Sequence, residues 1–175
     1  MGRVREVRVF SGRQVQGAQR YSSAKSTPET RRCLKVLKAL RNRVKKAEMM
    51  AENLRVQEWF RRLCAAGPVP FPQHHEQFTT PATSGVYVIY RRETVLHVGR
   101  TLRARGGLRQ RLKDHLYGRS SFTKKHLKGK GATLRKKGYK YRCLAVKNAR
   151  LRALVEAYAV GVLCPRHLGL GKREC

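Results

Sequence analysis

The most apolar segment of the chain, residues 153–164, contains a single charged side chain, Glu156. The whole chain carries 41 Lys and Arg against 10 Asp and Glu, a formal net charge of +31. In so charged a chain, a helix that is apolar on every side is expected to be buried. A buried carboxylate must be paired, protonated or bound to a metal. Glu156 is therefore either the partner of an arginine or a ligand for a hard cation beside a phosphate.

The positive charge also restricts the partners of the protein. Self-repulsion at +31 opposes a compact state, and a polyanion such as nucleic acid relieves it. An anionic membrane is the rival partner, but no apolar run approaches the roughly 20 residues that span a bilayer. A membrane-surface helix over residues 29–65 is weakly supported, because its apolar stripe is partly Ala. We therefore expect nucleic acid as a partner and no membrane.

The N-terminal residues 1–26 are rich in Gly, Ser, Gln and Arg and show little periodicity, which predicts a disordered basic arm. An organelle transit peptide is the alternative, because this arm is poor in acids. The five cysteines form no C-x-x-C pair, which argues against a zinc site and a disulfide framework. We expect reduced thiols and an intracellular location, cytoplasmic in a bacterium.

A basic helix is expected over residues 27–66, because Pro28 suits a first helical position and Gly67 suits the end. A heptad-like stripe predicts that this helix packs on its own domain, and a homodimer through the 34–54 helix is the alternative. The stripe consists of Leu37, Leu40, Val44, Ala47, Ala51 and Leu54. Pro70, Pro72 and Pro81 indicate a linker over residues 67–82.

The remaining residues, 83–175, are expected to form one α+β domain. Runs of β-branched and aromatic residues predict strands at 86–90 and 95–98, paired as an antiparallel hairpin. A small mixed sheet, made of this hairpin and a third strand, should then be flanked by helices. The other expected elements are a helix over 106–117, a helix over 121–127, a strand over 139–146 and a helix over 148–163.

Several motifs of this domain occur together in one order. Gly85-Val86-Tyr87 is followed ten residues later by His97-Val98-Gly99, and the next expected helix contains Arg111 and, four residues on, His115. Glu156 is followed nine residues later by Pro165. Over about residues 83–169 the chain thus resembles the GIY-YIG nuclease family, closest to its restriction-endonuclease-like branch with an Arg-x-x-x-His helix.

The resemblance implies a metal-dependent endonuclease that hydrolyses phosphodiester bonds, with DNA favoured over RNA. Glu156 would hold Mg²⁺ or Mn²⁺, which accepts few protein ligands. Tyr87 would help to deprotonate the attacking water, its pKa lowered by surrounding positive charge. Arg111 would bind the scissile phosphate, and His115 would reach the same phosphate or Tyr87. His97 would orient the phosphate or the water.

The chain departs from the family at two positions: His97 replaces the second tyrosine, and Leu168 stands where the family has Asn. These departures favour the alternative of a catalytically inactive nucleic-acid-binding module with the same fold, such as a basic ribonucleoprotein component. Taken singly, Tyr87 is also a common core residue, and Arg111 and His115 suit a solvated helix face.

A basic stretch surrounds the motifs. Between Arg100 and Arg142 the sequence has sixteen Lys and Arg and one acid, Asp114. Such residues contact phosphates and position nucleic acid without reading its sequence. The residues expected to do so are Arg100, Arg103, Arg105, Arg109, Lys113, Arg119, Lys124, Lys125, Lys128, Lys130, Arg135, Lys136 and Lys137.

Overall fold

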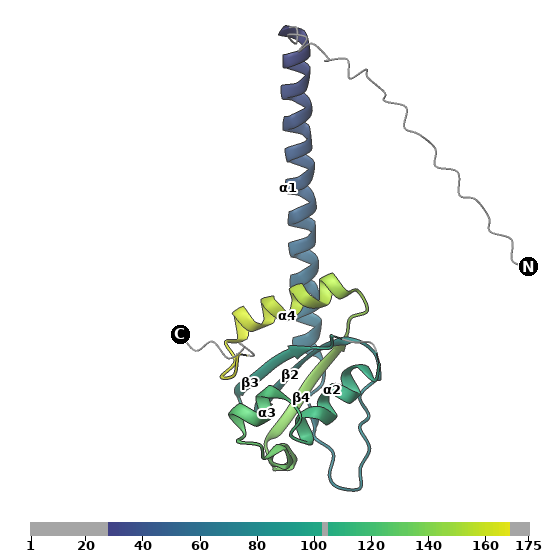
Figure 1. Cartoon of the computed structure of the whole chain (residues 1–175), viewed down its shortest axis with the longest axis vertical. Coiled ribbons are helices and arrows are strands. Elements are labelled where there is room, and N and C mark those ends of the chain that lie inside the picture. Colours follow the sequence, from purple (N-terminus) through teal and green to yellow (C-terminus); the bar gives the residue numbers. More distant parts are fainter. Residues whose placement is uncertain (1–27, 103–104, 169–175) are drawn as a thin grey trace, which may run out of the picture. The chain divides into compact units, whose positions relative to one another are not determined.

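The computed structural model describes residues 28–102 and 105–168 (Figure 1). The predictions for the basic arm and for Arg103 lie outside these residues. The chain divides into two units, Met1–Arg43 and Val44–Cys175. Helix α1, Pro28–Ala65, provides the described part of the first unit and begins the second.

A four-stranded sheet forms the centre of the second unit. Its strands are β1 (Val69–Pro70), β2 (Gly85–Arg91), β3 (Thr94–Arg100) and β4 (Tyr139–Ala145), in the order β1-β4-β2-β3. The expected hairpin is confirmed as β2 and β3, and the α+β class holds. The expected mixed sheet is wrong, because all pairings between these strands are antiparallel. In addition, residue 97 of β3 forms an isolated parallel bridge with residue 167, which follows the last helix.

The helices after the hairpin agree with the sequence pattern to within one or two residues. They are α2 (Gly107–Leu116), α3 (Ser121–His126) and α4 (Ala149–Leu163). Helix α4 begins where expected, because the Asn148 side chain accepts a hydrogen bond from the Leu151 amide at 2.9 Å. The basic loop that follows α3 contains an unpredicted 3₁₀ turn, η1 (Gly131–Arg135).

Two apolar cores cover the two faces of the sheet. Side chains alternate along a strand, so Tyr87 and Ile89 of β2 face one core while Val86 and Val88 face the other. Leucines of α2, together with Phe122 of α3, fill the first core. The C-terminal part of α1 and one side of α4 fill the second.

The segment expected to be a linker contributes to the sheet and to the first core. Val69–Pro70 pairs with β4 at the sheet edge, where a proline is tolerated. Phe71 and Phe78 are buried, and both contact the ring of Tyr141. Prolines therefore shape this segment without separating it from the domain.

The expectation that the stripe of α1 packs on its own domain is wrong for Val44 and Leu54, which lie in the second unit and are exposed. Val56 and Leu63, nearer the end of the helix, are buried instead. Among the helices that the structure describes, none is both long and apolar enough to cross a membrane.

Candidate functional site

Tyr87 lies in β2 directly opposite Gly99 of β3. Its side chain is completely buried. A Cβ atom on residue 99 would lie 2.4 Å from the Tyr87 hydroxyl oxygen, so any larger residue would displace the ring. Gly99, which ends the motif His97-Val98-Gly99, therefore leaves room for Tyr87, which ends the motif Gly85-Val86-Tyr87.

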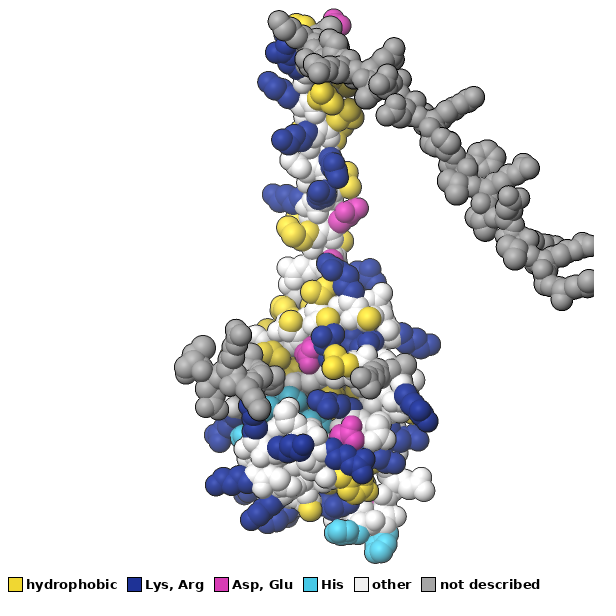
Figure 2. Space-filling model, in the orientation of Figure 1, with side chains coloured by type: hydrophobic (Ala, Val, Ile, Leu, Met, Phe, Trp, Pro, Cys, Tyr) yellow, Lys and Arg dark blue, Asp and Glu magenta, His cyan; other side chains and the backbone are white. Residues whose placement is uncertain are grey.

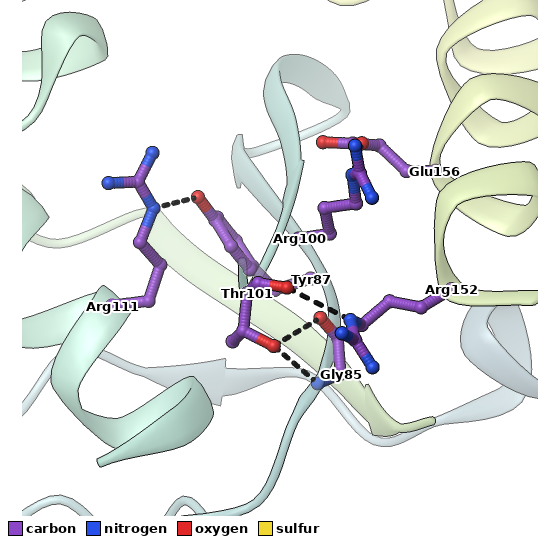
Figure 3. Close-up of polar contacts among 7 residues, drawn as sticks. All are labelled: Gly85, Tyr87, Arg100, Thr101, Arg111, Arg152 and Glu156. Carbon is purple, nitrogen blue, oxygen red and sulfur yellow. Dashed lines mark hydrogen bonds and ion pairs between the residues drawn. The ribbon is translucent and has the colours of Figure 1, made fainter. Parts of the chain in front are cut away.

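The Tyr87 hydroxyl is held by two side chains of α2. Its oxygen lies 2.6 Å from Nε2 of His115. Nε of Arg111 donates to the same oxygen at 3.2 Å, as Figure 3 shows. Residues four apart share one side of a helix, which lets Arg111 and His115 reach the same atom. Three residues expected at one site are thus in direct contact.

The hydrogen bonds around His115 fix the direction of its bond to Tyr87. The Thr123 hydroxyl donates to the His115 carbonyl at 2.7 Å, so the Ser120 hydroxyl donates to Thr123 at 2.9 Å. Ser120 then accepts from Nδ1–H of His115 at 2.6 Å. Burial holds the pKa of His115 well below its usual value, so the ring is neutral and Nε2 has no proton. The Tyr87 hydroxyl therefore donates to Nε2.

Ser120 and Thr123 were not identified from the sequence. Ser120 also caps α3, because its side chain accepts from the Thr123 amide at 3.1 Å. A serine immediately before a short helix is the signal that could have indicated a cap. Its second role, holding one tautomer of His115, depends on packing that the sequence pattern does not reveal.

The expectation that positive surroundings lower the pKa of Tyr87 is wrong. Burial raises this pKa to about 12, because the phenolate would lose its hydration. Arg111 opposes the shift, and the Glu156 carboxylate adds to it. Tyr87 is therefore neutral at pH 7, and it can take a proton from water only if its own proton moves to His115.

Glu156 forms an ion pair with Arg100. Oε2 of Glu156 lies 2.6 Å from Nε of Arg100, and the two side chains are 27% and 31% exposed (Figure 3). Desolvation raises the pKa of Glu156, and Arg100 opposes this shift. The expectation that α4 is buried on every side is wrong, because Ala157 and Val162 are exposed. In the free protein Glu156 is therefore the partner of an arginine, one of the two alternatives expected from the sequence, and the pair is half-buried.

Arg152 fixes α4 to the sheet one helical turn before Glu156. Its buried guanidinium donates to the carbonyls of Thr101 and Val146, each at 2.9 Å. Buried charged groups need such partners, so this contact restricts where α4 can lie. Arg152 was not identified from the sequence, although its position four residues before Glu156 places both on one side of the helix.

His97 packs beside this group and is 5% exposed. Its ring stacks on Phe122 at 5.0 Å between centroids, and its Nδ1 lies 3.3 Å from Nδ1 of His167. Burial lowers its pKa to about 4. A direct contact of His97 with phosphate is at odds with this burial. Leu168, in place of the family's Asn, is exposed.

The carboxylate available for a metal here is that of Glu156. The described residues contain no group of three or more His, Cys, Asp or Glu that could hold a metal ion. Mg²⁺ is often bound through one or two carboxylates and completed by water and phosphate oxygens. A single half-buried glutamate fits such an ion, and it does not fit an ion that requires a full set of protein ligands.

The basic residues lie mainly on α2, α3, η1 and the loops between them. Lys and Arg are spread over the face seen in Figure 2, where Asp and Glu are few. Arg100 is engaged by Glu156, and Arg109 and Arg135 donate to backbone carbonyls. Half-buried members of the predicted set are Arg100, Lys113 and Arg135; exposed members are Arg105, Arg109, Arg119, Lys124, Lys125, Lys128, Lys130, Lys136 and Lys137.

Comparisons with protein-family models, curated proteins and solved structures found no match. A neutral tyrosine that donates to a neutral histidine and accepts from an arginine can pass on a proton. Glu156 lies on α4, which packs against the opposite face of the sheet from Tyr87, yet its charge acts on the Tyr87 hydroxyl, and its carboxylate can bind a cation.

Proposed function

We propose that the domain of residues 83–175 is a GIY-YIG-like, metal-dependent endonuclease that hydrolyses phosphodiester bonds, most favourably in DNA. The observation that carries this proposal is the chain of hydrogen bonds from Arg111 through Tyr87 to His115. Its direction makes His115 the acceptor for the Tyr87 proton. A buried tyrosine that served only for packing would need one hydrogen-bond partner, whereas the Tyr87 hydroxyl has both a donor and an acceptor.

In the proposed reaction, a water oxygen attacks phosphorus and the bond to the leaving oxygen breaks. One water proton passes to the Tyr87 oxygen while the Tyr87 proton moves to Nε2 of His115. His115 becomes an imidazolium, with its Nδ1–H still held by Ser120. Arg111 stabilises negative charge on the tyrosine oxygen during the transfer. The described residues provide no partner for its two terminal amino groups, which can bind the phosphate.

Glu156 is the residue that would hold Mg²⁺ or Mn²⁺, and the ion would neutralise phosphate charge and stabilise the leaving oxygen. In the free protein, Arg100 forms an ion pair with this carboxylate. Binding of nucleic acid offers Arg100 a phosphate in its place. Arg100 therefore changes from a partner of Glu156 to a phosphate ligand when substrate binds.

Cleavage of supercoiled plasmid in Mg²⁺, in Mn²⁺ and in EDTA tests the proposal. Tyr87→Phe should reduce cleavage by about 100-fold or more, as the loss of general base catalysis implies. Tyr117→Phe is the matched control, because Tyr117 is exposed at the end of α2, two residues after His115. Equal activity of the two variants, or cleavage that persists in EDTA, would contradict the mechanism.

The second candidate is a nucleic-acid-binding module without catalytic activity. The 2.6 Å bond between Arg100 and Glu156 favours it, because a carboxylate paired in this way needs no metal. This candidate predicts tight duplex binding with no cleavage of DNA or RNA in either metal. A gel-shift assay beside the cleavage assay separates the two candidates.

A further inference from the structure

A cavity lies on the face of the sheet that packs against α1 and α4, opposite the face that holds the Tyr87 side chain. Its volume is about 580 Å³, within the usual range for pockets that hold small ligands. It opens beside the β2–β3 turn, between the ends of α1 and α4 and the start of β4. Its floor is apolar and is formed by Leu63, Val88, Val95 and Leu163.

This cavity is separate from the site around Tyr87. Val88 lines the cavity, and Tyr87, its neighbour in β2, points into the opposite core. The cavity also lies at the end of the hairpin that carries Arg92, whereas Arg100 and Glu156 lie at the other end. A ligand in the cavity would therefore not occupy the proposed phosphodiester site.

Positive side chains surround the apolar floor. Arg92, Lys137 and Lys140 are exposed at the rim, and Arg142 is half-buried in the wall. Glu93 is the acid among the lining residues. An apolar floor beneath a cationic rim complements a molecule that has an apolar body and an anionic head.

Two polar groups of the wall are buried without a hydrogen-bond partner in the described part of the chain: the Tyr90 hydroxyl and Nε of Arg142. Arg142 uses one terminal nitrogen to donate to the Cys64 carbonyl, and its guanidinium lies 5.7 Å from the centre of the Tyr90 ring. Most buried polar groups are hydrogen-bonded, so such orphans need an explanation. An acceptor oxygen on a bound ligand would satisfy both donors after small side-chain movements.

We propose that this cavity binds a small organic anion whose apolar body lies on the floor and whose carboxylate or phosphate meets the Arg142 side and the cationic rim. A fatty acid and a nucleoside monophosphate share this chemistry. The proposal does not depend on phosphodiester cleavage.

Titration calorimetry on the full chain, with decanoate and with adenosine monophosphate, tests the proposal and separates the two sources. Decanol and adenosine are the neutral counterparts, and inorganic phosphate is the head group alone. At least one of the two organic anions should bind with one site per chain and more tightly than its neutral counterpart and inorganic phosphate. The organic anion that binds more tightly identifies the class of ligand, a fatty acid or a nucleoside monophosphate.

A chain of charge +31 attracts any anion, so charge-matched variants are needed. Arg92→Gln with Lys140→Gln removes two rim charges and should weaken binding by about fivefold. Lys45→Gln with Lys46→Gln removes two charges from an exposed part of α1 and should leave the affinity unchanged. Tyr90→Phe should also weaken binding, without lowering the melting temperature, because its hydroxyl has no hydrogen-bond partner among the residues that the structure describes.

Three results would overturn the proposal: neither organic anion binds more tightly than inorganic phosphate, the neutral counterparts bind equally well, or the two double variants lose the same affinity.

Discussion

Replacing Glu156 with Gln separates a metal ligand from a structural ion pair, and Glu52→Gln is its matched control. Both glutamates form an ion pair with Nε of an arginine, at 2.6 Å from Arg100 and at 2.7 Å from Arg150. Both arginines lose an anionic partner when Gln is introduced. The two pairs differ in burial, because Arg150 is 73% exposed and Arg100 is 31% exposed.

The burial of the Arg100–Glu156 pair sets the expected loss of stability. Exposed pairs contribute about 0.2–1 kcal/mol, and breaking a fully buried pair costs about 3–5 kcal/mol. A half-buried pair lies between these limits, so Glu156→Gln should lower the free energy of unfolding by about 1–2 kcal/mol. For a domain of this size the melting temperature should fall by about 3–8 °C. Glu52→Gln should have the same melting temperature as the wild type.

Melting and plasmid cleavage should be measured on one preparation of each variant. Glu156→Gln should fold, bind duplex DNA and cleave about 1,000-fold more slowly, as the loss of about 4 kcal/mol at the transition state implies. Glu52→Gln should cleave like the wild type. If Glu156→Gln cleaves at the wild-type rate, Glu156 is not the metal ligand. If the wild type cleaves nothing while Glu156→Gln melts early, the pair is structural and the enzyme proposal fails.

Three further predictions concern pH, salt and association. His97 has a pKa of about 4 in the folded protein and about 6.5 when unfolded, so the folded state favours the neutral ring. The stability that depends on the neutral ring is therefore present above pH 6.5 and is lost as the pH falls towards 4. In urea unfolding, the free energy of unfolding should be about 2–3 kcal/mol lower at pH 4.5 than at pH 7. The His97→Asn variant should show a smaller difference. Duplex binding should show a slope of log K against log[salt] of about −0.9 per phosphate contact, and a slope shallower than about −2 would contradict a phosphate-binding surface. The exposed Leu37 and Leu40 of α1 should pack against the same residues of a second copy, so analytical ultracentrifugation should show a dimer. The double variant Leu37→Lys with Leu40→Lys should be a monomer, and a monomeric wild type would refute the prediction.

The elements with strong local signals could be predicted from the sequence. The hairpin follows from two β-branched runs around a short turn, and the start of α4 follows from Asn148 as a cap. The convergence of Tyr87, Arg111 and His115 was also expected, because the resemblance to a known family assigned them to one site. The hairpin and the helix start depend on residues that are close in the sequence.

Features that depend on tertiary packing could not be predicted in this way. The strand Val69–Pro70 has two residues, too few for an alternating pattern, and its prolines indicated a linker. The raised pKa of Tyr87 reflects complete burial, which outweighs the nearby arginine. The partner of Glu156 was one of many arginines, and only the position of β3 relative to α4 selects Arg100.

Pairing with arginine does not by itself distinguish Glu156 from the other acids. Glu58 pairs with Arg61 on the exposed surface of α1, and Glu52 of α1 pairs with the exposed Arg150 of α4. Glu156 differs because Arg152 anchors its helix to the sheet and because its charge acts on the Tyr87 hydroxyl. Bringing a phosphate to this position adds negative charge beside Glu156 and gives Arg100 a competing partner. A divalent cation would then compensate both anions, so metal binding at Glu156 should be tighter with nucleic acid present than without it.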